Sequence, residues 1–166
     1  MVRSAEELST KNFNDYSFLF IGGGNTFKLL HDLKKCGAFE KLFEYINNNG
    51  VVFGGSAGAI IFGKDLEACK LADDNEVDLQ DINGFDILKG ISILCHYTNG
   101  IPEEDEENKQ YLLELSQHRT SIALPEEITL FVNDNDIEII GNKPYYLFNK
   151  GQMFMKNNER PFIEQN

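Results

Sequence analysis

A serine lies among glycines at positions 54–58, where the sequence reads Gly-Gly-Ser-Ala-Gly. This run matches G-x-S-x-G, the pattern of a nucleophile on a sharp turn between a strand and a helix. The Ser56 hydroxyl would then point out from the carboxyl end of the strand. The N–H of Ala57, at the start of the helix, could face a developing oxyanion. The pattern is short, and a tight turn that only packs a helix on a strand needs the same small residues.

A second glycine turn, at 22–25, follows a separate apolar run. It is not the G-x-G-x-x-G motif of dinucleotide-binding proteins, because Phe27 occupies the position of the last glycine. Its backbone N–H groups could complete an oxyanion hole beside Ser56, could cradle a phosphorylated ligand, or could serve only the turn. The residues alone leave these three interpretations open.

A nucleophilic serine needs a general base, and the chain has three histidines. His31 and His118 fall within helical patterns, whereas His96 ends the apolar run that begins at Ile91. Because the carboxyl ends of parallel strands share one edge of a sheet, His96 is the histidine expected beside Ser56. Acidic residues that could orient its imidazole lie between the two, and the pattern does not choose among them: Asp73, Asp74, Glu76, Asp78 and Asp81.

Metal and cysteine chemistry have little support in the sequence. There is no His-x-x-x-His pair, Cys-x-x-Cys pair or EF-hand loop. Cys95 adjoins His96, but neighbours on a strand point to opposite faces, so we expect Cys95 in the core. Three sparse cysteines do not resemble a disulfide framework, which favours the reducing cytoplasm.

Two units of strand, glycine turn and helix open the chain. Apolar runs at 17–21 and 51–53 predict buried strands, each followed by one of the glycine turns. Helical spacing runs from Asn25 or Thr26 to Ile46 with an interruption at Gly37, and a short helix is expected at 60–62. This order is typical of an α/β protein with a parallel sheet.

The remaining segments predict more strands than helices. Residues 1–15 read as loop or frayed helix, and the acidic run 103–107 opens a helix that reaches towards His118. Hairpin turns are expected at 133–136 and 141–144. The expected strands are 68–72, 91–94, 121–124, 129–132, 137–140 and 145–148.

Length and charge narrow the class of protein. The 166 residues favour a single domain over 1–166, and 42% hydrophobic residues can supply its core. A net charge of −12 argues against nucleic acid or anionic membrane as a partner. The sequence has no apolar run of spanning length and no signal-peptide pattern at its start.

Five short segments, taken in order, resemble the peptidase E family, the aspartyl dipeptidases related to cyanophycinase. The resemblance extends from about residue 15 to residue 148. The segments that carry it are 21–30, 54–59, 83–86, 95–99 and 124–126.

This resemblance implies a flavodoxin-like three-layer α/β sandwich with a mainly parallel sheet, as in class I glutamine amidotransferases. It implies a cofactor-free serine peptidase that cleaves dipeptides or short peptides through an acyl-enzyme. Ser56 would be the nucleophile and His96 the base. The implied triad acid is Asp73, with Asp74 as the alternative. The other implied site residues are Gly23, Gly24 and Ala57 in the oxyanion hole, and Asn25 and Glu126 at the substrate.

The chain departs from the family pattern in two places. The family carries additional βα units before the segment at 18–24, so we expect an incomplete sheet and exposed apolar edges. Such a chain could be a fragment, could come from a mis-started reading frame, could rely on a partner subunit such as a second copy, or could be a silent member with a binding role. Second, Lys109, within an acidic run, stands where the family has a substrate-binding arginine, so a preference for aspartate is not expected.

Overall fold

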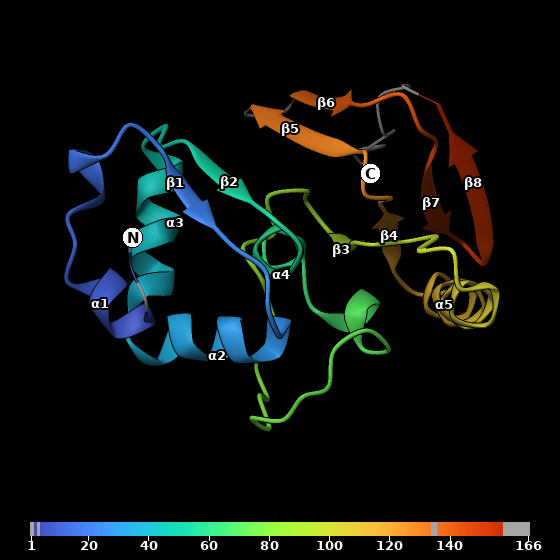
Figure 1. Cartoon of the computed structure of the whole chain (residues 1–166), viewed down its shortest axis with the longest axis horizontal. Coiled ribbons are helices and arrows are strands. Elements are labelled where there is room, and N and C mark those ends of the chain that lie inside the picture. Colours follow the sequence, from blue (N-terminus) through green and yellow to red (C-terminus); the bar gives the residue numbers. More distant parts are fainter. Residues whose placement is uncertain (1, 3, 134–135, 158–166) are drawn as a thin grey trace.

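The computed structural model describes residues 2, 4–133 and 136–157 as a mixed α/β structure (Figure 1). Within these ranges, the strands form a parallel pair, a four-stranded sheet and a hairpin, and no helix is long and apolar enough to cross a membrane. The helices are α1 (Ala5–Ser9), α2 (Thr26–Lys35), α3 (Ala38–Asn47), α4 (Ala57–Ile60) and α5 (Pro102–Leu115), with 3-10 turns η1 (Phe13–Asp15) and η2 (Glu67–Cys69). The strands are β1 (Leu19–Ile21), β2 (Val52–Gly54), β3 (Ile91–Leu94), β4 (Thr120–Ala123), β5 (Thr129–Asn133), β6 (Asp136–Ile140), β7 (Tyr145–Asn149) and β8 (Gln152–Lys156).

The N-terminal half repeats strand, glycine turn and helix, as predicted. β1 and β2 are parallel, with Phe20 opposite Phe53. Asn25 caps α2, because its side chain accepts a hydrogen bond from the Lys28 N–H at 2.9 Å. Gly37, at φ 74°, separates α2 from α3, as the interrupted helical pattern indicated.

The C-terminal half is built on a sheet in the order β3-β4-β7-β8. β3 and β4 are parallel, whereas β7 and β8 add in antiparallel fashion. β5 and β6 form a separate hairpin with Asn133 opposite Asp136, and the central turn residues 134–135 lie outside the described residues. The strands predicted from residue 91 onward are therefore confirmed to within one residue at each end.

The strand predicted at 68–72 is wrong: this segment is the 3-10 turn η2 followed by further turns. The cause is a buried carboxylate just before it. Asp65 accepts hydrogen bonds from the Glu67 N–H at 3.1 Å and the Ser92 hydroxyl at 2.7 Å, and it pairs with Arg119. These contacts anchor the chain in a turn, and a strand would pull the Glu67 N–H away from its acceptor.

Two further elements differ from the prediction, one in its start and one because it was not expected. The helix expected at 60–62 starts earlier, at Ala57, directly after the serine. β8 was not predicted at all. It follows β7 through a tight turn in which Lys150 and Gly151 both have positive φ, 52° and 72°. Such a turn matches the right-handed twist of a hairpin.

Close backbone packing holds the serine turn. A Cβ atom on Gly58 would lie 2.1 Å from the Ile21 carbonyl oxygen, and one on Gly54 would lie 2.1 Å from the Gly58 carbonyl oxygen. The start of α4 therefore sits directly against the end of β1. The N–H of Gly55 also donates to the Ile21 carbonyl at 2.9 Å, which ties the two glycine turns together.

Gly58→Ala is expected to destabilise the protein by about 1–3 kcal/mol, because backbone must move to admit the methyl group. Chemical denaturation of both proteins measures the difference. Gly22→Ala is the matched control, since its Cβ would meet only the Phe20 ring at 3.7 Å, an ordinary contact. Equal losses in the two variants would contradict this account of the turn.

Candidate active site

Ser56 occupies a strained position between β2 and α4. Its backbone has φ 53° and ψ −119°, a conformation that L-residues rarely adopt. Strain of this kind persists only where the surrounding structure enforces it, and it is common at reactive residues. Ala57 and Gly58, both buried, follow at the start of α4. The geometry is that of a nucleophile elbow.

His96 lies against the serine. It follows β3 after Cys95, has φ 58°, and its Nε2 is 2.7 Å from Ser56 Oγ. This is the hydrogen bond through which an imidazole can accept a hydroxyl proton. The structure brings Ser56 and His96 together as expected, but not on one sheet edge, because β2 belongs to the two-stranded sheet and β3 to the four-stranded sheet. His31 lies on α2, where its Nδ1 is 3.0 Å from an oxygen of Asp32.

The carboxylate beside His96 is Glu126, whose Oε1 forms a short hydrogen bond with His96 Nδ1. The two chain segments are joined just below the site. Leu124 donates its N–H to the Leu94 carbonyl at 2.9 Å, and Tyr97 donates to the Leu124 carbonyl at 3.1 Å. The parallel pairing of β3 and β4 therefore continues past the strand ends and brings the loop after β4 to the histidine.

Asp73, expected to orient His96, lies elsewhere. Its carboxylate accepts hydrogen bonds from the Thr26 N–H at 3.0 Å and from the Thr26 hydroxyl. The first turn of a helix has unpaired N–H groups that attract a carboxylate, which accounts for this position. Asp74 contributes its backbone carbonyl to the Asn25 amide, at 2.8 Å. Within the described part of the chain, no contact joins Asp73 or Asp74 to His96.

Asp73→Ala is expected to lower the free energy of unfolding by about 0.5–2 kcal/mol, the usual effect of removing a helix N-cap group. A urea titration measures it. Asp74→Ala is the control, because Asp74 bonds Asn25 through a backbone oxygen that the substitution keeps. If Asp74→Ala cost as much stability as Asp73→Ala, the bonds to Thr26 would not be the reason.

The glycine turn after β1 reaches the serine. A Cβ on Gly23 would lie 3.1 Å from Ser56 Cβ and 3.4 Å from its Oγ. Gly24 has φ 138°, a conformation that favours glycine, and a Cβ there would meet nothing within 4 Å. Asn25 is engaged with the α2 backbone and the Asp74 carbonyl. With Asp73 already at the α2 N-terminus, a phosphate there would meet a negative charge, which disfavours the phosphate-binding interpretation.

Cys95 also approaches the site, with its Sγ 3.8 Å from the Ser56 carbonyl oxygen. Burial raises the pKa of this thiol to about 12. The thiolate is the nucleophilic form of cysteine, so at neutral pH Cys95 is inert. All three cysteines are free, and the interpretation of Cys95 as a packing residue stands.

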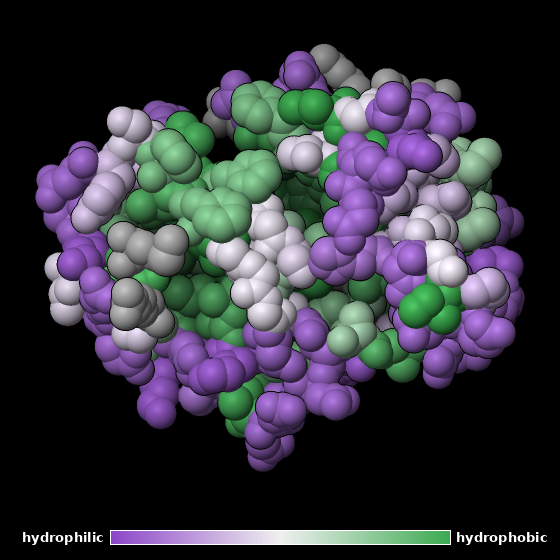
Figure 2. All heavy atoms as spheres, in the orientation of Figure 1, coloured by the Kyte–Doolittle hydropathy of each residue, from purple (hydrophilic) through white to green (hydrophobic). Residues whose placement is uncertain are grey.

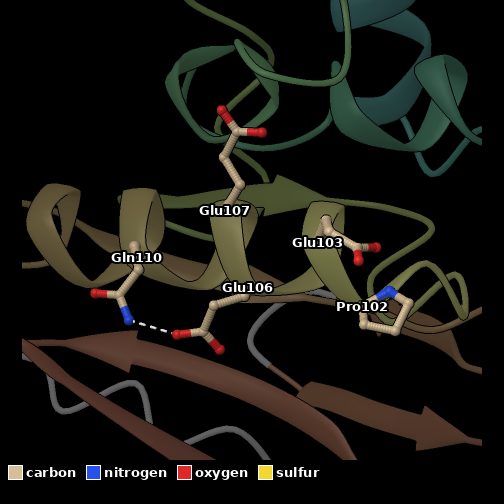
Figure 3. Close-up of a pocket in the computed structure, with 5 residues that line it drawn as sticks. All are labelled: Pro102, Glu103, Glu106, Glu107 and Gln110. Carbon is tan, nitrogen blue, oxygen red and sulfur yellow. Dashed lines mark hydrogen bonds between the residues drawn. The ribbon is translucent and has the colours of Figure 1, made fainter.

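Lys109, which stands in place of the family's substrate-binding arginine, lies on α5 and pairs with an acidic side chain. Lys109 Nζ pairs with Glu106 at 3.1 Å. An open hollow of about 530 Å³ is lined by side chains of α5. In Figure 3, Glu107 points away from the hydrogen bond between Gln110 and Glu106. Hydrogen bonds from Gln110 and Lys109 lower the pKa of Glu106, which keeps it charged.

In the described residues, no group of three or more His, Cys, Asp or Glu side chains could hold a metal ion.

Several known proteins are similar to this chain. Residues 2–140 match the model of peptidase family S51. Peptidase E of Nostoc sp. is 30% identical over 164 residues, covering 92% of this chain and 62% of the relative. Peptidase E of Citrobacter koseri is 29% identical over 145 residues, covering 83% of this chain and 61% of the relative. The chain thus spans about three fifths of the length of these curated relatives.

Two solved structures have a similar fold. One, from Listeria monocytogenes EGD-e and assigned to peptidase E, superposes with a TM-score of 0.69 and 23% identity, over 84% of this chain and 66% of the other. A peptidase from an acI-B1 Actinobacterium gives a TM-score of 0.69 and 16% identity, over 96% of this chain and 66% of the other. At these identities the likeness concerns the fold.

Proposed function

Because the chain belongs to peptidase family S51, we propose that it is a serine peptidase that hydrolyses dipeptides or short peptides. Its catalytic residues in this proposal are Ser56, His96 and Glu126. The observation that carries it is the continuous hydrogen-bonded line from Ser56 Oγ to His96 Nε2, and from His96 Nδ1 to Glu126. Nucleophile, base and orienting acid in this order are the parts of a hydrolytic triad.

The mechanism begins when Ser56 Oγ attacks the carbonyl carbon of the scissile bond. Its proton passes to His96 Nε2, and Glu126 stabilises the resulting imidazolium through Nδ1–H. The tetrahedral intermediate then collapses, the C–N bond breaks, and His96 returns the proton to the leaving amine. Water, deprotonated by His96, attacks the acyl-enzyme and releases the acid product and the free Ser56 hydroxyl.

The oxyanion of the intermediate needs donors on the far side of Ser56 from His96. The proposed donors are backbone N–H groups of Ala57, at the start of α4, and of Gly23 or Gly24. The close approach of Gly23 to the serine supports this assignment. Asp73 and Asn25 have a different part in this proposal: by fastening the α2 N-terminus, they fix the glycine turn that carries the donors.

The preferred peptides are proposed to lack an acidic side chain at the recognised position. Lys109 is the cation nearest the position of the family's arginine, and its pairing with Glu106 leaves little positive charge for a substrate carboxylate. The carboxylates of Glu103 and Glu107, on the same helix, would add negative charge that repels one. The wider proposal is a single, cofactor-free domain of flavodoxin-like architecture, related to class I glutamine amidotransferases and working in the cytoplasm.

A second candidate is a silent family member with a role in assembly. The observation in its favour is an uncovered apolar surface on β1 and β2, with Phe20 62% exposed. A library of dipeptides and short peptides, followed by mass spectrometry, separates the two functions. If the protein is a peptidase, we expect it to cleave a subset of the library in which few peptides contain aspartate. A folded protein that cleaves none of them would contradict the peptidase and favour the silent member.

A further inference from the structure

Three asparagines of the chain are followed directly by glycine: Asn49, Asn83 and Asn99. An asparagine in this setting is chemically labile, because the backbone nitrogen of the next residue can attack the side-chain carbonyl carbon. Glycine has no side chain to obstruct that approach. All three asparagines are exposed to the water that the reaction consumes. What distinguishes them is the bonding of the attacking nitrogen.

At two of the three sites the glycine N–H is hydrogen-bonded to the backbone. Gly50 donates to the Tyr45 carbonyl at 2.8 Å, just beyond the end of α3, and Gly84 donates to the Lys64 carbonyl at 2.9 Å. The nitrogen must lose its proton before it can attack, and a bond to a carbonyl oxygen holds that proton in place. Both of these sites are therefore protected.

The third site, Asn99–Gly100, lies in the exposed loop between β3 and α5, three residues after His96. Within the part of the chain that the structure describes, the Gly100 N–H donates to no acceptor. The Asn99 side chain reaches past Gly100, and its Oδ1 accepts a hydrogen bond from the Ile101 N–H at 2.9 Å. That bond polarises the side-chain carbonyl and makes its carbon easier to attack.

The loop also has room for the reaction. Gly100 has φ 88°, and a Cβ atom there would meet nothing within 4 Å. Figure 2 shows hydrophilic side chains, in purple, along the side of the molecule where α5 lies in Figure 1. Water therefore has access to this loop from outside.

We propose that Asn99 is a deamidation site, which converts to aspartate and isoaspartate with water as the co-reactant. The Gly100 nitrogen attacks Asn99 Cγ, a C–N bond forms, and Nδ2 leaves as ammonia together with the proton from the Gly100 nitrogen. Water then opens the resulting cyclic imide. Hydrolysis of the new C–N bond gives aspartate, and hydrolysis of the original peptide bond gives isoaspartate, in which the main chain runs through the side chain.

The contacts of Asn99 show what the modification would change. Its Nδ2 donates to Glu104 at 2.9 Å and its backbone N–H donates to Asp105 at 3.0 Å, which fastens the loop to the first turn of α5. After deamidation an oxygen replaces Nδ2, and the new carboxylate repels Glu104. Isoaspartate also lengthens the backbone between its neighbours. The modification would thus release the loop that follows His96 from α5.

Peptide mapping by mass spectrometry tests the site, on protein kept for days at neutral and at mildly alkaline pH. The expected result is conversion at Asn99 well ahead of Asn49 and Asn83, faster at the higher pH because the nitrogen reacts in its deprotonated form. Gly100→Ala should slow the conversion by about tenfold or more, the effect of a barrier about 1.4 kcal/mol higher.

Asn99→Gln guards against a Gly100→Ala protein that fails to fold. Its longer side chain would have to close a larger ring, so conversion at this position should be lost while Gly100 is kept. Faster conversion at Asn49 or Asn83 than at Asn99 would overturn the proposal. A rate at Asn99 that Gly100→Ala leaves unchanged in folded protein would overturn it too.

Asn99→Asp tests the release of the loop. This variant should melt about 2–4 °C below wild type, the shift expected when a contact of this kind is lost from a chain of this length. Asn142→Asp is the matched control, since it makes the same charge change at an exposed residue in the turn between β6 and β7 and should not shift Tm. An Asn99→Asp protein that melts with wild type would overturn the release. Neither readout uses enzymatic activity, so a failure here is distinguishable from a failure of the proposed peptidase.

Discussion

Ser56→Ala is expected to abolish peptide hydrolysis while leaving the fold intact. Ser56 Oγ is the atom that bonds to the substrate carbonyl, and alanine has no replacement for it. The loss should be about 10⁴-fold or more in kcat, down to the rate that binding and oxyanion donors alone support. The measurement is the initial rate on the best peptide of the library, with thermal melting as the check on folding.

The hydroxyl of Ser92, on β3, provides a contrast for this result. It is buried and donates to Asp65 away from the site, so Ser92→Ala should cost stability and leave the rate per folded molecule unchanged. If Ser56→Ala kept wild-type turnover in a purified, folded sample, Ser56 would not be the nucleophile.

Glu126→Gln is expected to lower kcat by about 10²–10⁴-fold, with a smaller change in KM. Glutamine has nearly the same shape, but it cannot stabilise the imidazolium of His96 and can hold the imidazole in the wrong tautomer. The loss should persist across the whole pH range in which the wild type is active. Steady-state kinetics on one peptide from low to high pH measures it.

Two variants make the Glu126 result specific. Glu127→Gln removes the same charge from the adjacent exposed position and should have a kcat close to wild type. Asp73→Asn removes the charge of the acid that the family resemblance implied, and its effect on kcat should be far smaller than that of Glu126→Gln. The opposite ranking, with Asp73→Asn the more damaging, would return the role of orienting acid to Asp73.

The proximity of Ser56 and His96 could be predicted from the sequence because each lies two residues after the end of a strand. A residue at the carboxyl end of a parallel strand has its place fixed by the sheet, and the strand ends before Ser56 and His96 were readable as apolar runs. The carboxylate beside His96 was harder to predict, because a loop after any neighbouring strand can supply one. The useful signal was the run 121–124, which ends two residues before Glu126 and pairs in parallel with β3.

One of the segments that were not predicted, the turn at η2, depends on contacts between residues that are distant in the sequence. The turn at η2 depends on Asp65, whose partners Ser92 and Arg119 are far along the chain. No local pattern at 68–72 reports them, and its apolar residues resemble a strand. β8 is a different case, since Lys150 and Gly151 offered a turn signal, but the strand after it alternates weakly.

The most direct test asks whether Ser56 reacts as a nucleophile that His96 activates. Wild-type protein would be treated with a fluorophosphonate and its intact mass measured over time, beside Ser56→Ala and His96→Ala. We expect one adduct on the wild type, none on Ser56→Ala and much slower labelling of His96→Ala. A folded wild type that stays unlabelled, or labelling that survives Ser56→Ala, would contradict the proposed site.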